Sequence, residues 1–318
     1  MFLFFVNALR KKYNMNLSYL PVRFHLRFSS PVYADIPPLF ILRSMLGKNL
    51  RSMSCIAHQN KCPDCMYNKT CSYAFLFETI LEQKNDVIPG RNKGSHPFIF
   101  TQGKNPAKKK IEEYDFTISL LGKATEYLPY IYAAFVRAGR DGLFKNRVPF
   151  AITKVCVGEK NILIDPEHLD TSVSASIWKY NYDLPPQNGD VLVELHSPLR
   201  FKYNGKYGTD FAAQDFMNCL YRRMKTLCTL YGSTDGMPEY THGETNVIAD
   251  KKLSWHDERH YSARQKSAMS LGGVMGTLKL HGTFSASEQN LLDFSKLFNA
   301  GKNTNFGLGQ FDFWTKWE

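Results

Sequence analysis

The sequence predicts an α+β fold made of two tandem units with the same order, strand–helix–strand–strand–helix–strand. Three observations predict it. Apolar and polar residues alternate in segments of strand length, apolar residues recur at helical spacing in four longer segments, and both halves end with a helix, a glycine-containing basic loop and a strand. This is the order of a ferredoxin-like, or RRM-like, domain. Four clustered cysteines interrupt the first unit, and they predict a four-cysteine metal-binding insertion.

The first unit opens with the clearest strand pattern. From Leu17 to Phe28, apolar residues alternate with basic ones such as Arg23 and Arg27, which predicts one apolar and one basic face. A helix is expected from about Pro37 to Met53, with Asp35 as its cap. The later elements are an apolar stretch at Tyr73–Leu81, a short run at Phe98–Phe100, a strand at Tyr114–Leu121, a helix at Lys123–Ala138 and a strand at Val148–Val157.

The second unit repeats this order. Ser285 and Glu288 form a capping-box pattern at the start of its last helix. Its elements are a strand at Val191–Tyr203, a helix at Phe211–Tyr231, two strand-like segments around Gly272 and Gly273 of which the second is Gly276–Phe284, the capped helix, and a strand at Gln310–Trp317.

Turn-forming dipeptides place the boundary between the units. The expected organisation is an N-terminal extension at 1–15, a first domain at 16–158 with the cysteine insertion at 55–71, a linker at 159–189, and a second domain at 190–318 that contains a glycine-rich loop.

The charge of the chain favours a polyanionic partner. Forty Lys and Arg residues against 29 Asp and Glu give a formal net charge of +11. Nucleic acid and an anionic membrane surface are the two common polyanions, and no strongly amphipathic basic helix supports the second. No apolar run reaches the roughly 20 residues that cross a bilayer, and basic residues follow the apolar N-terminus, the reverse of a secretory signal. We therefore expect a cytoplasmic protein.

The cysteine cluster has the spacing C-x6-C-x2-C-x5-C, formed by Cys55, Cys62, Cys65 and Cys71. Four thiolates this close in sequence can surround one tetrahedral ion, so zinc is the first expectation. A [4Fe–4S] cluster takes four cysteines as well and remains the alternative. A site with four thiolate ligands leaves no position open for water, which predicts a structural role.

The second candidate site is the glycine-rich loop from Gly301 to Gln310. Glycines allow a close approach of the backbone to a phosphate, and successive amides can form an anion-binding nest. Lys302 adds a positive charge. The segment from Gly139 to Arg147 occupies the corresponding place in the first half and is also basic.

Several motifs resemble one known family. Residues 255–265, which contain His256, His260, Tyr261 and Arg264, are followed by glycine motifs at 271–276 and 301–309. Together they resemble the C-terminal domain of CRISPR precursor-RNA processing endoribonucleases of the RAMP superfamily.

Further segments extend this resemblance over most of the chain. They are Ser197–Arg200 on a strand, Tyr221–Arg223 on a helix and Leu42–Gly47 in the first helix. The cysteine cluster before an aromatic segment is similar to one subgroup of the family. His260 and Phe144 depart from its pattern, since arginine and glycine are more usual there.

The resemblance implies a metal-independent endoribonuclease that binds the repeat of a CRISPR transcript and cuts within it. The ribose 2′-OH attacks the adjacent phosphorus and leaves a 2′,3′-cyclic phosphate and a 5′-OH, with no cofactor needed for catalysis. The implied partner is CRISPR repeat RNA, with a CRISPR effector complex and a second copy of the chain as further candidates. The alternative is a non-catalytic RNA-binding subunit of a CRISPR interference complex.

Such cleavage needs a base, an acid and cations. The candidate catalytic residues are His58, which follows the first helix, and the group His256, His260 and Tyr261. The candidate RNA-binding residues are Arg23, Arg27, Arg43, Arg51, Arg222, Arg223, Arg264, Gly301, Lys302, Asn305, Gly307 and Gly309. Each of these side chains also has an ordinary structural or solvent-exposed alternative.

Overall fold

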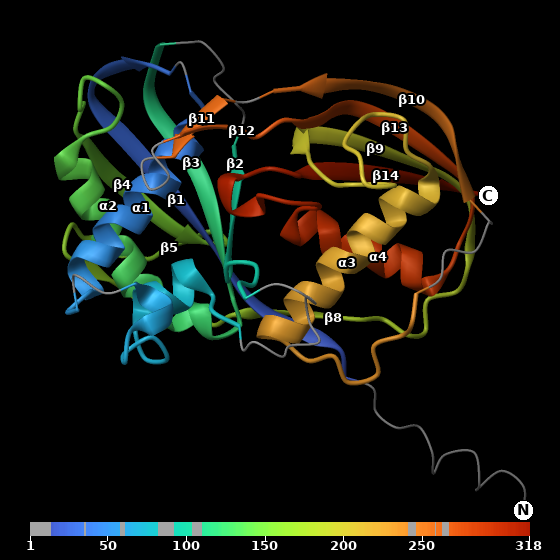
Figure 1. Ribbon diagram of the computed structural model, residues 1–318, viewed down its shortest axis with the longest axis horizontal. Helices are drawn as coiled ribbons and strands as arrows, with labels where there is room; N and C mark the ends of the chain where they lie inside the picture. Colours follow the sequence, from blue (N-terminus) through green and yellow to red (C-terminus); the bar gives the residue numbers. More distant parts are fainter. Residues whose placement is uncertain are drawn as a thin grey trace, which may run out of the picture.

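The computed structural model of the chain contains two α+β lobes that lie side by side (Figure 1). It describes residues 14–34, 36–57, 61–81, 92–103, 110–240, 246–257, 259–262 and 267–318, and of residues 259–262 and 267–270 it describes only the backbone.

The first lobe is a sheet covered by two helices. Its strands stand in the order β2-β3-β1-β4-β5, and β8 pairs with the beginning of β1. The strands are β1 (Asn16–Tyr33), β2 (Phe98–Gln102), β3 (Lys110–Leu121), β4 (Phe150–Val157), β5 (Lys160–Asn161) and β8 (Ser176–Lys179). The helices α1 (Pro38–Ser54) and α2 (Leu128–Asp141) pack against each other.

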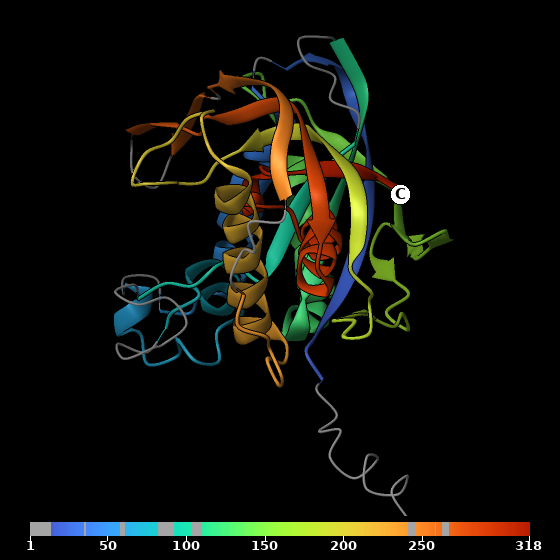
Figure 2. The same ribbon diagram turned by 90° about the vertical axis from the view of Figure 1, so that its right-hand side faces the viewer.

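The second lobe repeats this architecture. Its strands stand in the order β10-β13-β9-β14, and α3 and α4 run along one side of the sheet (Figure 1, Figure 2). The elements are β9 (Gln187–Leu199), α3 (Ala213–Tyr231), β10 (Asn246–His256), β13 (Gly273–Phe284), α4 (Ala286–Phe298) and β14 (Phe311–Trp317).

Short elements connect these units. Two are separate ribbons, β6 (Leu163–Asp165) with β7 (His168–Leu169), and β11 (Arg259–Ser262) with β12 (Ser267–Ser270). Single helical turns are η1 (Cys62–Asp64), η2 (Ala74–Glu78), η3 (Gly122–Tyr127) and η4 (Thr304–Phe306).

The strand order confirms the predicted fold. In each lobe the first strand lies between the third and the fourth, and the second strand lies outside the third, which is the antiparallel arrangement of a ferredoxin-like unit. The alternation in β1 produces the expected faces, because Val22 and Phe24 are fully buried whereas Arg23 is exposed. The capping box also forms, since Glu288 N donates to Ser285 Oγ at 3.3 Å.

Two local expectations differ from the structure. The neighbour of β13 is β10, which ends at His256; the segment just before Gly272 forms β12, which pairs only with β11. Because β10 and β9 already pair with the two edges of β13, the strand-like segment before Gly272 pairs with β11 in a separate ribbon and does not join the sheet. The N-cap of α1 is Pro37, not Asp35, which itself lies outside the described residues.

The two lobes share β1. Met15, just before β1, and Leu17, at its start, are buried in the core of the second lobe, whereas the inward-facing residues from Leu20 onward are buried in the core of the first. The predicted linker contributes as well, because Trp178 of β8 is buried in the second core. Within the described residues, no helix is both long and apolar enough to cross a membrane.

Candidate functional site

A glycine-rich loop, residues 299–310, lies at the boundary between the lobes. It connects α4 to β14, and its turn η4 packs on β2 and α1 of the first lobe. Asn299 Nδ2 donates a hydrogen bond to Phe100 O at 3.2 Å, and the ring of Phe306 meets that of Phe40 edge-on, with 5.7 Å between centroids. The loop singled out in the sequence is therefore part of the contact between both lobes.

Two glycines allow the loop to fold closely against its own lobe. Gly309 has a φ of 74°, and a Cβ atom there would lie 1.8 Å from Ala300 O. Gly301 has a φ of 72°, and its Cβ would lie 2.5 Å from Arg200 O. The amides of Lys302 and Gly309 donate to main-chain carbonyls of the β9 region. These two amides therefore hold the loop. The amides of residues 306–308 and 310 also donate hydrogen bonds within the second lobe, so the predicted nest for phosphate would depend on those of residues 303–305.

On one side of this loop lies a cleft of about 580 Å³ between the lobes, which we call the cationic cleft. Its wall combines the start of the loop with polar side chains from both lobes, namely His96, Lys202, Arg222, Arg223, Lys302 and Asn305. Four predicted RNA-binding side chains are thus brought together here, with the backbone of Gly301 beside them.

A tyrosine beside this cleft is surrounded by cations. Lys302 Nζ donates to Tyr207 OH at 3.3 Å, and the guanidinium carbon of Arg200 lies 4.1 Å from the centroid of the Tyr207 ring. Partial burial raises the pKa of Tyr207, but the hydrogen bond from Lys302 and the charges of Lys302, Arg200 and Lys202 outweigh it, so that the pKa is lowered overall. A phenol with a lowered pKa exchanges its proton more readily than an ordinary tyrosine.

Arg223 holds the loop from inside. It is 6% exposed, and its guanidinium donates to Phe298 O at 3.2 and 3.3 Å and to Thr304 Oγ1 at 2.7 Å. Burial lowers the pKa of Arg223 to about 10. Its neighbour Arg222 is exposed on the same helix. Of these two adjacent arginines, one positions the loop and the other faces solvent.

His96 belongs to a network with the first helix. Arg43 Nη2 lies 3.2 Å from His96 Nε2, and Thr79 Oγ1 lies 3.3 Å from His96 Nδ1. Because a guanidinium only donates hydrogen bonds, Nε2 accepts and the ring proton lies on Nδ1. The guanidinium of Arg43 also lies 5.1 Å and 4.6 Å from the ring centroids of Phe77 and Phe306. The predicted RNA-binding residue Arg43 therefore joins the two lobes.

On the other side of the loop lies a small pocket of about 80 Å³, to which two histidines contribute. His196 comes from β9 and His256 from the end of β10, and the backbone of Gly307 forms part of the same wall. Pro37 and Phe40 at the start of α1 close it from the first lobe. We call this cavity the two-histidine pocket, because a predicted catalytic residue and a second histidine both line it.

An aspartate orients one of these rings. His196 Nε2 lies 3.1 Å from Asp312 Oδ2, and Lys296 Nζ lies 2.9 Å from Asp312 Oδ1. Burial raises the pKa of Asp312, but the interactions with Lys296 and His196 outweigh it and lower the pKa overall. An ionised carboxylate only accepts hydrogen bonds, so the proton of a neutral His196 ring lies on Nε2 and Nδ1 is left as the basic atom.

Several predicted site residues are not seen in this arrangement. His58 and Arg264 lie outside the described residues. His260 and Tyr261 are consecutive residues of β11, whose side chains the structure does not describe. The roles predicted for these four residues stay predictions.

The remaining predicted arginines lie in the first lobe. Arg23 and Arg27 stand on the outer face of its sheet, where they pair with Asp115 and Glu113 at 2.9 and 2.7 Å. Arg51 lies on α1, with its guanidinium carbon 5.6 Å from the centroid of the Tyr73 ring. None of these three lines the cationic cleft or the two-histidine pocket.

The four clustered cysteines come close to one another. Cys55, Cys65 and Cys71 line one cavity of about 430 Å³, and Cys62 interacts electrostatically with Cys55 and Cys71. All four carry free thiols. Among the described residues, however, no group of three or more His, Cys, Asp or Glu side chains is arranged to hold a metal ion. The donor chemistry suits zinc or a [4Fe–4S] cluster, and both the metal site and the identity of its metal stay predictions.

Sequence reasoning missed two contributors to these sites, His96 and Tyr207, and ranked a third, His196, below the other candidate histidines. His196 follows the alternation of its strand as an ordinary polar residue, His96 precedes a short apolar run, and Tyr207 lies in a loop. The sequence offered one signal for these residues, the glycine-rich loop, because residues that pack against that loop lie close to the candidate site.

Two family models match the chain. The model of the AF_1859_N N-terminal domain matches residues 17–175, half of the chain. The model of the CRISPR-associated endoribonuclease Cas6 matches residues 193–311, which include the two-histidine pocket residues His196 and His256 and the glycine-rich loop. No curated protein sequence matches.

Solved structures share the fold at low identity. A partial Cas6–RT–Cas1–Cas2 complex matches with a TM-score of 0.52 and 12% identity, over 94% of this chain and 46% of that one. Cas6 of Thermus thermophilus matches with a TM-score of 0.49 and 12% identity, over 94% of this chain and 99% of that one. With the tandem ferredoxin-like fold, the two family models lead to one conclusion: the chain carries an AF_1859_N N-terminal domain in residues 17–175 and a domain of the CRISPR-associated endoribonuclease Cas6 in residues 193–311.

Proposed function

We propose that this protein binds CRISPR repeat RNA and cuts the precursor transcript once within each repeat without a catalytic metal ion. The 2′-oxygen forms a bond with the adjacent phosphorus while the bond from phosphorus to the 5′-oxygen breaks. A base removes the 2′ proton and an acid protonates the 5′-oxygen. The products are a 2′,3′-cyclic phosphate and a 5′-OH.

The observation that carries this proposal is the pair of imidazoles in one pocket. His196 and His256 line the same interdomain cavity beside Gly307, and acid–base cleavage of RNA needs two proton-transfer groups near one phosphate. Asp312 orients His196 with Nδ1 as the basic atom. In this proposal His196 and His256 share the roles of base and acid.

The cationic cleft supports the proposal from the other side of the loop. Lys202, Lys302 and Arg222 lie along it, and cations at this position attract the phosphates on either side of the scissile bond. A chain threaded from the cleft to the two-histidine pocket passes over the glycine-rich loop, which lines both. In this proposal Lys302, which lines the cleft, stabilises the negative charge that develops on the phosphate.

The test uses repeat RNA labelled at its 5′ end and incubated with the protein in EDTA. We expect one cut per repeat and a product that a 3′-phosphatase acts on only after the cyclic phosphate is opened. Replacing His196 or His256 by Ala should lower the single-turnover rate by about 10²- to 10⁴-fold, the usual contribution of a general acid or base. RNA affinity should change by less than about threefold, because an imidazole contributes little phosphate binding.

His281→Ala is the matched control. His281 lies on the same sheet and also pairs with an aspartate, Asp190, at 2.9 Å, but it lines neither cavity. If both pocket variants cleave at the parental rate, neither His196 nor His256 is the base. His58, His260 and Tyr261 would then be replaced in the same assay. Tight binding by the unmodified protein without any product would instead identify the non-catalytic RNA-binding subunit.

A further inference from the structure

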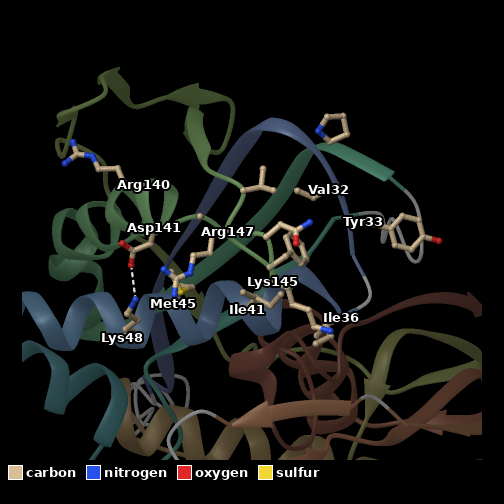
Figure 3. A pocket seen from close by; sticks show the side chains of 15 residues that line it. Val32, Tyr33, Ile36, Ile41, Met45, Lys48, Arg140, Asp141, Lys145 and Arg147 are labelled. Carbon is tan, nitrogen blue, oxygen red and sulfur yellow. Dashed lines mark hydrogen bonds and ion pairs between the residues drawn. The ribbon is translucent and has the colours of Figure 1, made fainter.

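A second basic cavity lies in the first lobe, away from the glycine-rich loop. It has a volume of about 1070 Å³ and lies between α1, the end of β1 and the loop that joins α2 to β4 (Figure 3). It is larger than the cationic cleft, at about 580 Å³, and shares no lining residue with it. We call it the first-lobe pocket.

The loop that forms this pocket is the counterpart of the glycine-rich loop. Each joins the last helix of a ferredoxin-like unit to its last strand. Each also turns at a left-handed glycine whose Cβ would collide with backbone: 2.1 Å from Arg147 O at Gly142, and 1.8 Å from Ala300 O at Gly309. The same structural position therefore borders a cavity in both lobes.

The first-lobe loop is held in an uncommon conformation. Phe144 and Arg147 have φ angles of 63° and 48°, a left-handed region that non-glycine residues rarely occupy. Two hydrogen bonds of 2.9 Å between Leu143 and Val148 close the turn. Such strain persists where the surroundings enforce it, and it is concentrated at functional sites.

The lining combines positive charge with apolar surface. Lys48 pairs with Asp141 at 3.0 Å, which leaves Arg140, Lys145 and Arg147 as a cationic rim that forms no ion pair with any described residue. The inner wall is apolar, with Ile41 and Met45 from α1 and with Tyr33, which is 61% exposed, at the mouth (Figure 3). Cations beside an accessible aromatic ring are typical of a binding site for unpaired nucleotides.

One helix connects this pocket to the proposed active site. Phe40 of α1 lines the two-histidine pocket, whereas Ile41 and Met45 line the first-lobe pocket. Five residues of helix rise by on the order of 8 Å, a distance that a single strand of RNA spans in one or two nucleotides. A strand leaving the two-histidine pocket over the start of α1 therefore reaches the first-lobe pocket.

We propose that the first-lobe pocket is a second RNA subsite, which takes one unpaired nucleotide of the strand that is cut. Its base lies against Tyr33 at the mouth, and its phosphates contact Lys145 and Arg147. The proposal rests on the proposed function only in taking RNA as the ligand. A concave cavity accepts a single base but not the outside of a duplex.

The charge of the rim is tested with Lys145→Glu combined with Arg147→Glu. The control combines Lys179→Glu with Lys316→Glu, two exposed lysines far from the pocket lining that give the same change in net charge. We expect the pocket variant to bind repeat RNA about 10- to 100-fold more weakly. The slope of log affinity against log salt concentration should decrease by the amount that corresponds to roughly one to two phosphate contacts. The control should lose less than about threefold. Equal losses in both would overturn the subsite.

The base is tested by a scan of the repeat with single abasic nucleotides. One abasic position should weaken binding to the unmodified protein by about fivefold to 100-fold, the range expected for one stacked base. The same abasic RNA should bind the Tyr33→Ala variant about as tightly as the intact RNA binds that variant. If no position shows this coupling, the pocket does not hold a base. Both experiments measure binding, so they remain decisive even if the protein does not cleave RNA. Thermal unfolding of each variant shows whether a loss reflects folding.

Discussion

Asn299 donates its side-chain amide to the main-chain carbonyl of Phe100, 3.2 Å away, and thereby ties the glycine-rich loop of the second lobe to β2 of the first. The same amide also donates to Leu308 O at 3.1 Å. Asn299 is 1% exposed, so water cannot replace these bonds. The geometry of the candidate site therefore depends on an interdomain hydrogen bond.

Replacing Asn299 by Gly should destabilise the protein by about 2–4 kcal/mol, because two buried carbonyls lose their donor. Glycine is the suitable test because Asn299 has a φ of 54°, which glycine adopts without strain. Urea unfolding measures the loss. A change below about 0.5 kcal/mol would mean that the carbonyls find other partners.

The adjacent arginines of α3 should separate structure from RNA binding. Arg223→Ala should cost about 2–4 kcal/mol, since it removes the charged donor of Phe298 O and Thr304 Oγ1. Arg222→Ala, on the exposed face, should stay within about 0.5 kcal/mol. Only Arg222→Ala should weaken RNA binding without a loss of stability, as measured by titration at several salt concentrations. Equal unfolding free energies for the two variants would contradict this assignment.

Asp312→Asn should lower the cleavage rate by about 10- to 100-fold, because the amide no longer fixes the tautomer of His196. RNA affinity should be unchanged. The measurement is the single-turnover rate, with Asp190→Asn, beside His281, as the matched control. A parental rate in Asp312→Asn would show that orientation of His196 by this carboxylate is unimportant.

The stability effect of Asp312 should depend on pH in a defined way. Its folded-state pKa lies below the ordinary value of 3.8, so its contribution is complete above that value and is lost as the pH falls through the lower, folded-state pKa. The side chain is 41% exposed, and screening by water limits the contribution to about 1 kcal/mol. The difference in unfolding free energy between the unmodified protein and Asp312→Asn should be present above about pH 5 and should shrink below about pH 4.

Purified protein should contain about one zinc ion per chain, or the iron and brown colour of a [4Fe–4S] cluster. Cys62→Ser combined with Cys65→Ser should abolish the metal content in elemental analysis and lower the melting temperature. Cys228→Ser is the control, because burial raises the pKa of the Cys228 thiol to about 12 and it lies apart from the cluster. Metal-free protein with an unchanged melting temperature would contradict the prediction.

The local patterns of the chain predicted the four long helices and the main sheet strands of both units. The alternation in β1 and the leucine stripe of α1 at Leu39, Leu42, Leu46 and Leu50 follow from the periods of a strand and a helix. Errors arose where several segments could supply the same element. The strand-like segment before Gly272 does form a strand, β12, but β10 supplied the partner of β13, and β12 pairs with β11 in a separate ribbon.

The sequence by itself determined the two ferredoxin-like units, the glycine-rich loop and the net charge of +11, because these depend on periodicity and composition along the chain. Only the tertiary structure decided which residues meet across the lobes. His196 and His256 are 60 positions apart and share one pocket, whereas Arg222 and Arg223 are adjacent and face opposite environments. Proximity between lobes is set by how the two sheets pack, and no local pattern encodes it.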